Sequence, residues 1–109
     1  MLTLRLARLT VFLVALLGTG CSRAPDIEAL CAKVAHCEDK PVSACVTERR
    51  ELYEAQRARG CGDEGAAVVA CEIEHGRCET GGDMTLFMPT ETCRPLILDL
   101  GACFDRTRQ

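Results

Sequence analysis

The hydrophobic positions that follow residue 25 recur at helical spacing, and they predict a bundle of short helices. The first predicted helix covers residues 27 to about 37, with Asp26 as its N-terminal cap. Residues 39–41 end it, because Pro41 cannot continue the hydrogen-bond ladder of a helix. Its apolar face consists of Ile27, Leu30 and Val34.

A second helix is predicted over residues 43–59, whose interior is rich in helix-forming residues and alternates acidic with basic side chains. Gly60 suits the position just after its C-terminal cap. A third helix is expected to begin with Asp63 as its cap and to stop at Gly76. Its inner face is expected to consist of Ala66, Val69, Ala70 and Ile73.

Residues 79–89 are expected to form a loop, with Gly81 and Gly82 at its centre. Thr92 is the expected cap of a fourth helix, because Pro95 then lies in the first turn, where no N–H is needed. The buried stripe of this helix is expected to contain Leu96, Ile97, Leu100 and Phe104. No alternation of useful length indicates a strand. The predicted fold class is therefore all-α, with about four short helices in two antiparallel hairpins.

A charged and then apolar segment precedes this predicted bundle. Arg5 and Arg8 supply positive charge, residues 9–17 form an apolar run (LTVFLVALL), and the small residues of positions 18–20 precede Cys21. This is the layout of a secretory signal. The run is too short to cross a bilayer, which requires about 20 apolar residues.

Residues 17–21 (LGTGC) resemble the lipobox of bacterial lipoproteins, although Gly18 stands where that family prefers leucine. The resemblance implies that Cys21 receives a diacylglycerol and that the chain is cut just before it. Ser22 after the cysteine implies sorting to the outer membrane, as in enteric bacteria. The alternative is an ordinary secretory signal that is cut after Gly20 and releases a secreted protein.

The expected organisation is a signal peptide over residues 1–20, a lipidated tether over 21–25 and a cysteine-rich helical domain over 26–109. In this organisation the chain resembles the small cysteine-rich helical lipoproteins of bacteria. Its expected location is the cell envelope, where the lipid on Cys21 would hold it to a membrane. Stable anchoring by acyl chains requires more than one chain.

The nine cysteines of the chain divide into Cys21 and eight others. An exported compartment is oxidising enough for disulfides, so the eight predict a framework of four bridges. The eight are Cys31, Cys37, Cys45, Cys61, Cys71, Cys78, Cys93 and Cys103. In the first helical hairpin the favoured bridge is Cys31–Cys45, which is symmetric about residue 38.

The spacing Cys61-x9-Cys71 recurs as Cys93-x9-Cys103, and the two pairs are symmetric about position 82. A nested pairing of Cys61 with Cys103 and of Cys71 with Cys93 would join the third and fourth helices. Such an arrangement resembles the twin-CX9C helical hairpin. A shifted register, Cys71–Cys103 with Cys78–Cys93, remains open.

Composition and charge argue against one class of partner and indicate how the domain is stabilised. Loss of Arg5 and Arg8 with the signal lowers the 13 basic residues to 11 against 16 acidic ones, a net charge of about −5. This balance argues against nucleic acid as a partner, because its binding requires a basic surface. A single small domain with no Trp and one Tyr buries a limited core, so disulfides are expected to supply stability.

Two groups of residues have the composition of a reactive site. Cys71, His75 and Cys78 could hold zinc near one helix end, and His36 could activate the thiol of Cys37. Participation of these cysteines in disulfides is the favoured interpretation, so no metal, cofactor or catalytic residue is predicted. A solvated acidic face is expected near the end of the third helix, formed by Glu72, Glu74, Glu79 and Asp83.

The apolar cluster Leu86, Phe87 and Met88 either covers the core between the third and fourth helices or forms a contact patch for a partner. The leading functional hypothesis is a lipid-anchored, non-enzymatic envelope protein that serves as an interaction or structural module, with an unidentified envelope protein as partner. The first alternative is a carrier of a small apolar ligand in a cavity between helices. The second is a thiol-active or metal-binding enzyme.

Overall fold

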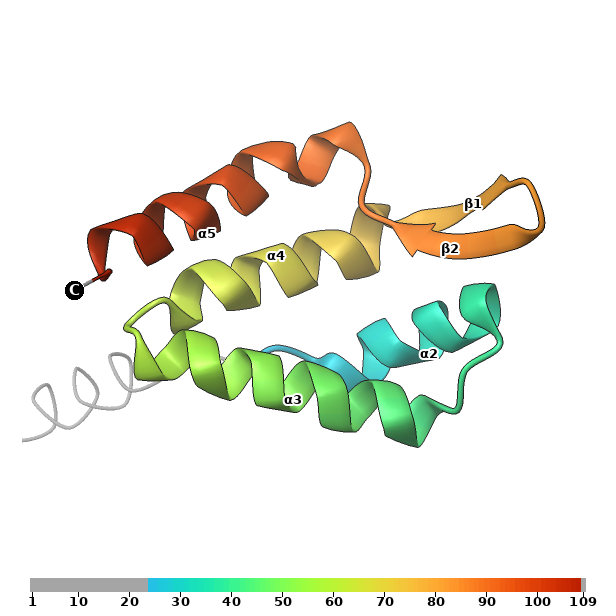
Figure 1. Ribbon diagram of the computed structural model, residues 1–109, viewed down its shortest axis with the longest axis horizontal. Helices are drawn as coiled ribbons and strands as arrows, with labels where there is room; N and C mark the ends of the chain where they lie inside the picture. Colours follow the sequence, from blue (N-terminus) through green and yellow to red (C-terminus); the bar gives the residue numbers. More distant parts are fainter. Residues whose placement is uncertain (1–23, 109) are drawn as a thin grey trace, which may run out of the picture.

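A computed structural model describes residues 24–108 of the chain, so the expected signal peptide and Cys21 lie outside the described residues. Two helical hairpins lie side by side, and a β-hairpin extends from one end of the molecule (Figure 1). None of the helices within residues 24–108 combines the length and apolar character needed to cross a membrane. In chain order the elements are α2 (Ile27–Glu38), α3 (Val42–Ala58), α4 (Gly62–His75), β1 (Arg77–Gly81), β2 (Met84–Met88), η1 (Glu91–Cys93) and α5 (Arg94–Arg106).

Helix α2 begins and ends where its sequence predicts. The carboxylate of Asp26 accepts a hydrogen bond of 3.1 Å from the backbone N–H of Ala29, which satisfies one of the free amide groups of the first turn. Asp39 ends the helix in the left-handed conformation, with φ of 52°. The predicted apolar face is confirmed, because Ile27, Leu30 and Val34 are all buried.

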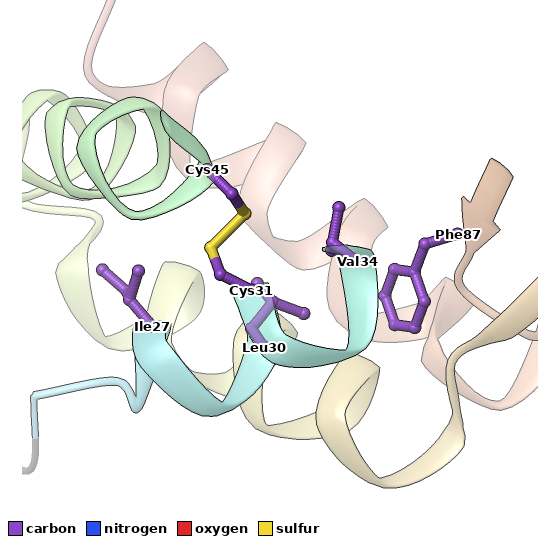
Figure 2. Packing of buried hydrophobic residues seen from close by; sticks show 6 residues of the cluster. All are labelled: Ile27, Leu30, Cys31, Val34, Cys45 and Phe87. Carbon is purple, nitrogen blue, oxygen red and sulfur yellow. A yellow bond between two sulfur atoms is a disulfide. The ribbon is translucent and has the colours of Figure 1, made fainter. Parts of the chain in front are cut away.

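The cluster of buried apolar residues is built around α2 (Figure 2). Cys31 on α2 is bonded to Cys45 on α3, and this bridge lies within the cluster. The ring of Phe87, from β2, lies against Val34 at the other end of the cluster. Strand β2 therefore closes one end of the core that α2 and α3 form.

Helix α4 lies between α3 and α5 (Figure 1) and contacts both. Two nested disulfides, Cys61–Cys103 and Cys71–Cys93, join α4 and its N-terminal cap to α5 and η1. Of the two registers that the sequence leaves open, this is the nested one, and the shifted register is not present. The fourth bridge joins Cys37 on α2 to Cys78 on β1.

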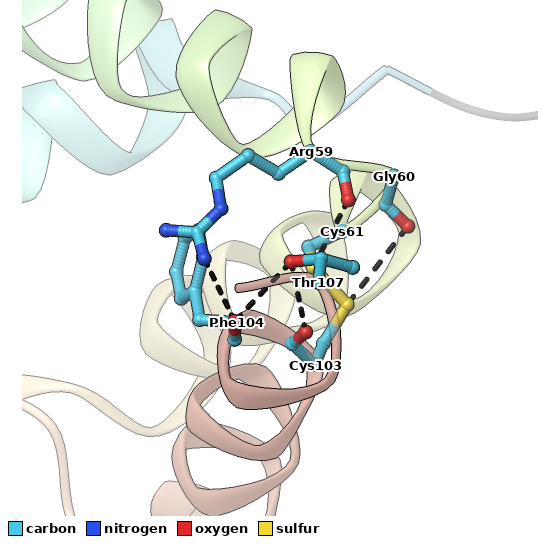
Figure 3. The surroundings of a disulfide bond; sticks show 6 residues. All are labelled: Arg59, Gly60, Cys61, Cys103, Phe104 and Thr107. Atoms are coloured by element: carbon cyan, nitrogen blue, oxygen red, sulfur yellow. Dashed lines mark hydrogen bonds between the residues drawn. A yellow bond between two sulfur atoms is a disulfide. The ribbon is translucent and has the colours of Figure 1, made fainter. Parts of the chain in front are cut away.

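The outer bridge of this pair is covered by the turn between α3 and α4 (Figure 3). A guanidinium nitrogen of Arg59 donates a hydrogen bond of 2.7 Å to the carbonyl oxygen of Phe104, and its Cζ lies 4.5 Å from the centroid of the Phe104 ring. At the end of α5, the hydroxyl of Thr107 donates to the carbonyl oxygen of Cys103 over 3.1 Å. The C-terminus of α5 is thus attached both to α4 and to the end of α3.

The four expected helices are present, but the fold is not purely all-α and residues 79–89 are not a loop, because β1 and β2 form an antiparallel two-stranded sheet. The turn between them has two residues, Gly82 and Asp83, and Gly82 adopts φ of 60°. Glycine tolerates this conformation, which suits a tight hairpin turn. The following strand alternates in exposure: Thr85 is half-buried and Phe87 is buried, whereas the three residues between and beside them are exposed. The fold is therefore mainly helical with a small sheet.

Two predicted helix details are also wrong. Cys61 rather than Asp63 precedes α4, and Asp63 lies in the first turn of that helix. On α4, Ala70 is exposed, and the buried positions are instead Gly65, Val68, Cys71 and Glu72. The other predicted positions, Ala66, Val69 and Ile73, are half-buried, and Val69 and Ile73 pack against the core, so the covered face of α4 is wider than predicted because the helix packs between two neighbours.

The start and the packing of α5 differ from prediction as well. Thr92 lies inside the short helix η1, and Pro95 does lie in the first turn of α5. The expected buried stripe is only partly covered: Leu96, Leu100 and Phe104 are half-buried and Ile97 is exposed. The reason is that α5 packs mainly on α4, so one side of its apolar stripe remains open.

Candidate functional sites

The structure divides the predicted contact patch between the core and the surface. Phe87 is buried, whereas Leu86 and Met88 are 40% and 43% exposed. Met84 lies on the same side of β2 and is 61% exposed. We call Met84, Leu86 and Met88 the hairpin face. The alternative in which the whole cluster covers the core between the third and fourth helices is wrong, because Phe87 packs on α2.

Charged residues border the hairpin face. Arg77 pairs directly with Met88 across the two strands, and Glu79 pairs with Leu86. Directly opposite residues lie on the same side of a sheet, so both charges share the side of the three apolar residues. Arg77 Nε and Glu79 Oε1 lie 3.8 Å apart. The result is an exposed apolar strip with one cation and one anion along its edge.

The hairpin is attached to the body of the protein at one end of α2. Glu38, the last residue of α2, accepts a hydrogen bond from the backbone of Phe87, and the preceding Cys37 is bonded to Cys78. The first described residue, Ala24, lies just before the other end of α2. A helix of 12 residues spans about 18 Å, so this distance separates the start of the domain from the hairpin along α2 (Figure 1).

All eight cysteines of the described domain form disulfides, so the residues proposed for zinc or thiol chemistry carry no free thiol here. Cys71 and Cys78 are bonded to different partners, Cys93 and Cys37. His75 is exposed and lies 3.8 Å from Glu74. The structure therefore does not bring Cys71, His75 and Cys78 together as ligands.

A second candidate site is a groove over α4, between α3 and α5, that the sequence analysis did not identify. Its volume is about 220 Å³. We call it the α4 groove. Its apolar walls come from all three helices: Leu52 and Tyr53 on α3, Val68 and Val69 on α4, and Ile97 and Leu100 on α5. Its polar lining consists of Arg49, Gln56 and Glu72.

Glu72 is buried in this groove, which corrects the expectation that it belongs to a solvated acidic face. Burial raises the pKa of the Glu72 carboxyl above its usual value, and the nearby Arg49 guanidinium lowers this pKa only in part. The spacing of residues in the sequence indicates that Glu72 shares a helical face with buried positions. Glu72 follows Gly65 by seven residues and Val68 by four, a spacing that puts all three on one helical face.

Gln56 is the second buried polar side chain of the groove. It occupies the space that a Cβ atom at Gly65 would take, so the glycine allows α3 and α4 to approach closely here. The floor of the groove therefore combines a carboxyl and an amide between apolar walls. Such a combination of apolar walls and a few polar groups is typical of sites for small ligands.

Comparison of this chain with known protein families, with curated proteins and with solved structures finds no match.

Proposed function

We propose that this protein is a lipid-anchored, non-enzymatic module of the cell envelope that presents the hairpin face to a protein partner. The observation that carries the proposal is the position of the hairpin face. Its three apolar side chains are exposed on a hairpin that is covalently fixed to the domain through Cys37 and Cys78. Exposed apolar residues that cluster together, with charges along the edge, are typical of protein contact surfaces.

The geometry of the domain supports this role for an anchored protein. The expected lipid on Cys21 would precede Ala24 by only a short tether. The hairpin lies at the opposite end of α2 from Ala24, so a helix of about 18 Å separates the hairpin from the end of the domain to which the tether would connect. The four disulfides would keep this arrangement in an oxidising compartment without a large apolar core.

The anchor is tested by the intact mass of the protein purified from its native host, alkylated with and without prior reduction. The expected species begins at Cys21, carries acyl mass and gains eight alkyl groups only after reduction. Detection of a species without acyl mass would refute the lipid anchor and support the secreted alternative. Detection of a species that is alkylated before reduction would support the thiol-active or metal-binding alternative.

The contact surface is tested in cells of the native host with a photo-crosslinking amino acid at position 86. A crosslinked envelope protein is expected, whereas the same amino acid at position 102, on the exposed surface of α5, should not capture it. Leu86→Ser should reduce complex formation, and Leu98→Ser provides a control at another exposed leucine. Equal crosslinking at both positions, or equal effects of the two serine variants, would refute the hairpin face as the contact surface.

A further inference from the structure

The α4 groove contains a charged side chain that the rest of the described protein leaves without a hydrogen bond. The side chain of Glu72 is only 10% exposed. Among residues 24–108, its ion pair is with Arg49, and the two charged atoms lie 4.0 Å apart, which is beyond hydrogen-bond distance. A carboxylate that is mostly removed from water and has unused acceptor capacity is costly, although the Glu72 oxygens are not fully sealed from solvent.

The second buried polar side chain of the groove also lacks a hydrogen bond to the rest of the described protein. Gln56 is 7% exposed, and no hydrogen bond joins its side-chain amide to another described residue, although its amide atoms are not fully sealed from solvent. Its carbonyl oxygen can accept a hydrogen bond, as the oxygens of Glu72 can. Two buried groups in one groove therefore offer acceptors that residues 24–108 do not use.

The charge of the groove favours a cation over an anion. Arg49 is the cationic member of the lining, but its side chain is 31% exposed and can be solvated by water. The less solvated group is the carboxyl of Glu72. A positively charged hydrogen-bond donor should therefore bind here more tightly than a hydrogen-bond acceptor. The apolar walls from α3, α4 and α5 require that the remainder of the ligand be apolar.

We infer that the α4 groove binds a small amphiphile whose primary ammonium group donates hydrogen bonds to Glu72 and whose apolar chain lies against Val69 and Leu100. An ammonium group carries three donors and no acceptor, which matches an ionised carboxylate in a groove that is also lined by an amide. The groove is smaller than typical sites for drug-sized ligands and suits a short alkyl chain. This site is separate from the hairpin face, so the inference does not depend on the proposed function.

The experiment is an NMR titration of the oxidised protein with n-hexylammonium chloride at pH 7.5. We expect saturable shifts of the Val69 and Leu100 methyl groups. Two ligands of the same chain length serve as comparisons: n-hexanol, which lacks the charge, and hexanoate, which reverses it. n-Hexylammonium should bind about tenfold more tightly than either, because a charge-assisted hydrogen bond contributes roughly that factor.

Three variants separate the carboxyl from the general charge of the protein. Glu72→Gln should weaken n-hexylammonium binding about tenfold while leaving n-hexanol binding unchanged. Glu74→Gln removes the same charge from an exposed position of α4 and should have no effect. Arg49→Gln removes a competing cation and should strengthen the binding of n-hexylammonium.

Several results would overturn the inference. These are the absence of saturable shifts, equal affinity for n-hexylammonium and n-hexanol, and wild-type affinity in a folded Glu72→Gln variant. Tighter binding of hexanoate, with loss of that binding in Arg49→Gln, would assign the groove to an anionic ligand instead. Circular dichroism and the eight alkyl groups gained only after reduction establish that each variant is folded.

Discussion

The backbone N–H of Phe87 donates a hydrogen bond of 3.0 Å to Oε2 of Glu38, the last residue of α2. Phe87 lies directly opposite Cys78 in the sheet, and Cys78 is bonded to Cys37, the neighbour of Glu38. Two consecutive residues of α2 therefore hold the two members of one cross-strand pair, one covalently and one by a hydrogen bond. This double attachment fixes the hairpin to the end of α2.

Glu38→Ala should loosen β2 without unfolding the domain. The Glu38 side chain is only 17% exposed, and hydrogen bonds to charged acceptors stabilise more than neutral ones. Hydrogen exchange of the Phe87 amide, followed by NMR, should accelerate about tenfold or more. Glu38→Gln keeps an acceptor and should produce a smaller effect. Unchanged exchange in Glu38→Ala would show that the disulfide alone holds the strand.

Phe87→Ala should destabilise the domain by about 3–5 kcal/mol, which is typical for removal of a buried aromatic side chain. Phe87 is buried in the cluster with Val34, whereas Met88 is exposed. Met88→Ala should therefore change the free energy of unfolding by less than about 1 kcal/mol. Denaturant unfolding with the disulfides intact measures both values. Similar losses in the two variants would contradict the core role of Phe87.

The Cys37–Cys78 bridge should be the first disulfide to be reduced. Cys78 is exposed and Cys37 is half-buried, whereas the six cysteines of the other three bridges are all buried. Thiolate attack on a disulfide requires access to a sulfur atom. Brief treatment with a low concentration of dithiothreitol, followed by alkylation and peptide mapping, should label these two cysteines first.

The outcome that would contradict this expectation is earlier labelling of Cys31, Cys61 or Cys71. A Cys37→Ser/Cys78→Ser variant should retain the helical circular dichroism of the wild type, because the other three bridges hold α2 to α3 and α4 to α5. The variant should nevertheless be less stable, since a bridge that closes a long loop contributes about 4 kcal/mol in the chain-entropy treatment.

Glu72 should make a contribution to stability that falls as pH rises from the usual pKa of a glutamate through the raised pKa of its folded state. Burial raises the pKa of Glu72 in the folded state, so the folded state binds more protons than the unfolded state between the unfolded and the folded pKa. The free energy of unfolding therefore decreases with increasing pH through that window.

Glu72→Gln should remove this contribution and increase the free energy of unfolding at pH 7 relative to the wild type. Glu74→Gln, at an exposed position of the same helix, is the matched control and should leave the pH dependence unchanged. Denaturant titrations from pH 4 to pH 8 measure the effect. A Glu72→Gln variant that is less stable than the wild type at pH 7 would show that the ion pair with Arg49 outweighs the cost of burial.

Much of the helical architecture could be predicted from local features of the sequence. Asp26 caps α2 because its carboxylate can reach the amide of Ala29 within one turn, and the spacing of the apolar residues determines the buried face. The symmetric cysteine spacing likewise reduced the bridges between the third and fourth helices to two registers, of which the structure contains the nested one, Cys61–Cys103 with Cys71–Cys93. These features depend on residues that are close in sequence or on a simple hairpin geometry.

The β-hairpin is not predicted above, although the residues of its turn and the alternation after it are typical of one. Gly82 and Asp83 form a two-residue turn of a composition that favours hairpins, and the residues after it alternate. The strand β1 supplies no comparable signal, since all its residues are exposed. Only the contact of β2 with α2, through Phe87, shows which side of the alternation is buried.

The α4 groove could not be predicted because it depends on the relative positions of three helices. Helical spacing puts Glu72 and Val68 on one face, but burial of that face requires α3 on one side and α5 on the other. The close approach at Gly65 depends on Gln56, nine positions earlier and on another helix. No pattern within a single helix contains this information.

The overlap of the four bridges along the chain has a consequence for cleavage by proteases. Cys31–Cys45, Cys37–Cys78 and Cys61–Cys103 span successive and overlapping stretches of the backbone. A single cut at any peptide bond between Cys31 and Cys103 therefore leaves the two fragments joined by at least one disulfide. A protein attached to a surface through its N-terminus would keep its nicked C-terminal fragment, and release of that fragment would require a reductant as well as a protease.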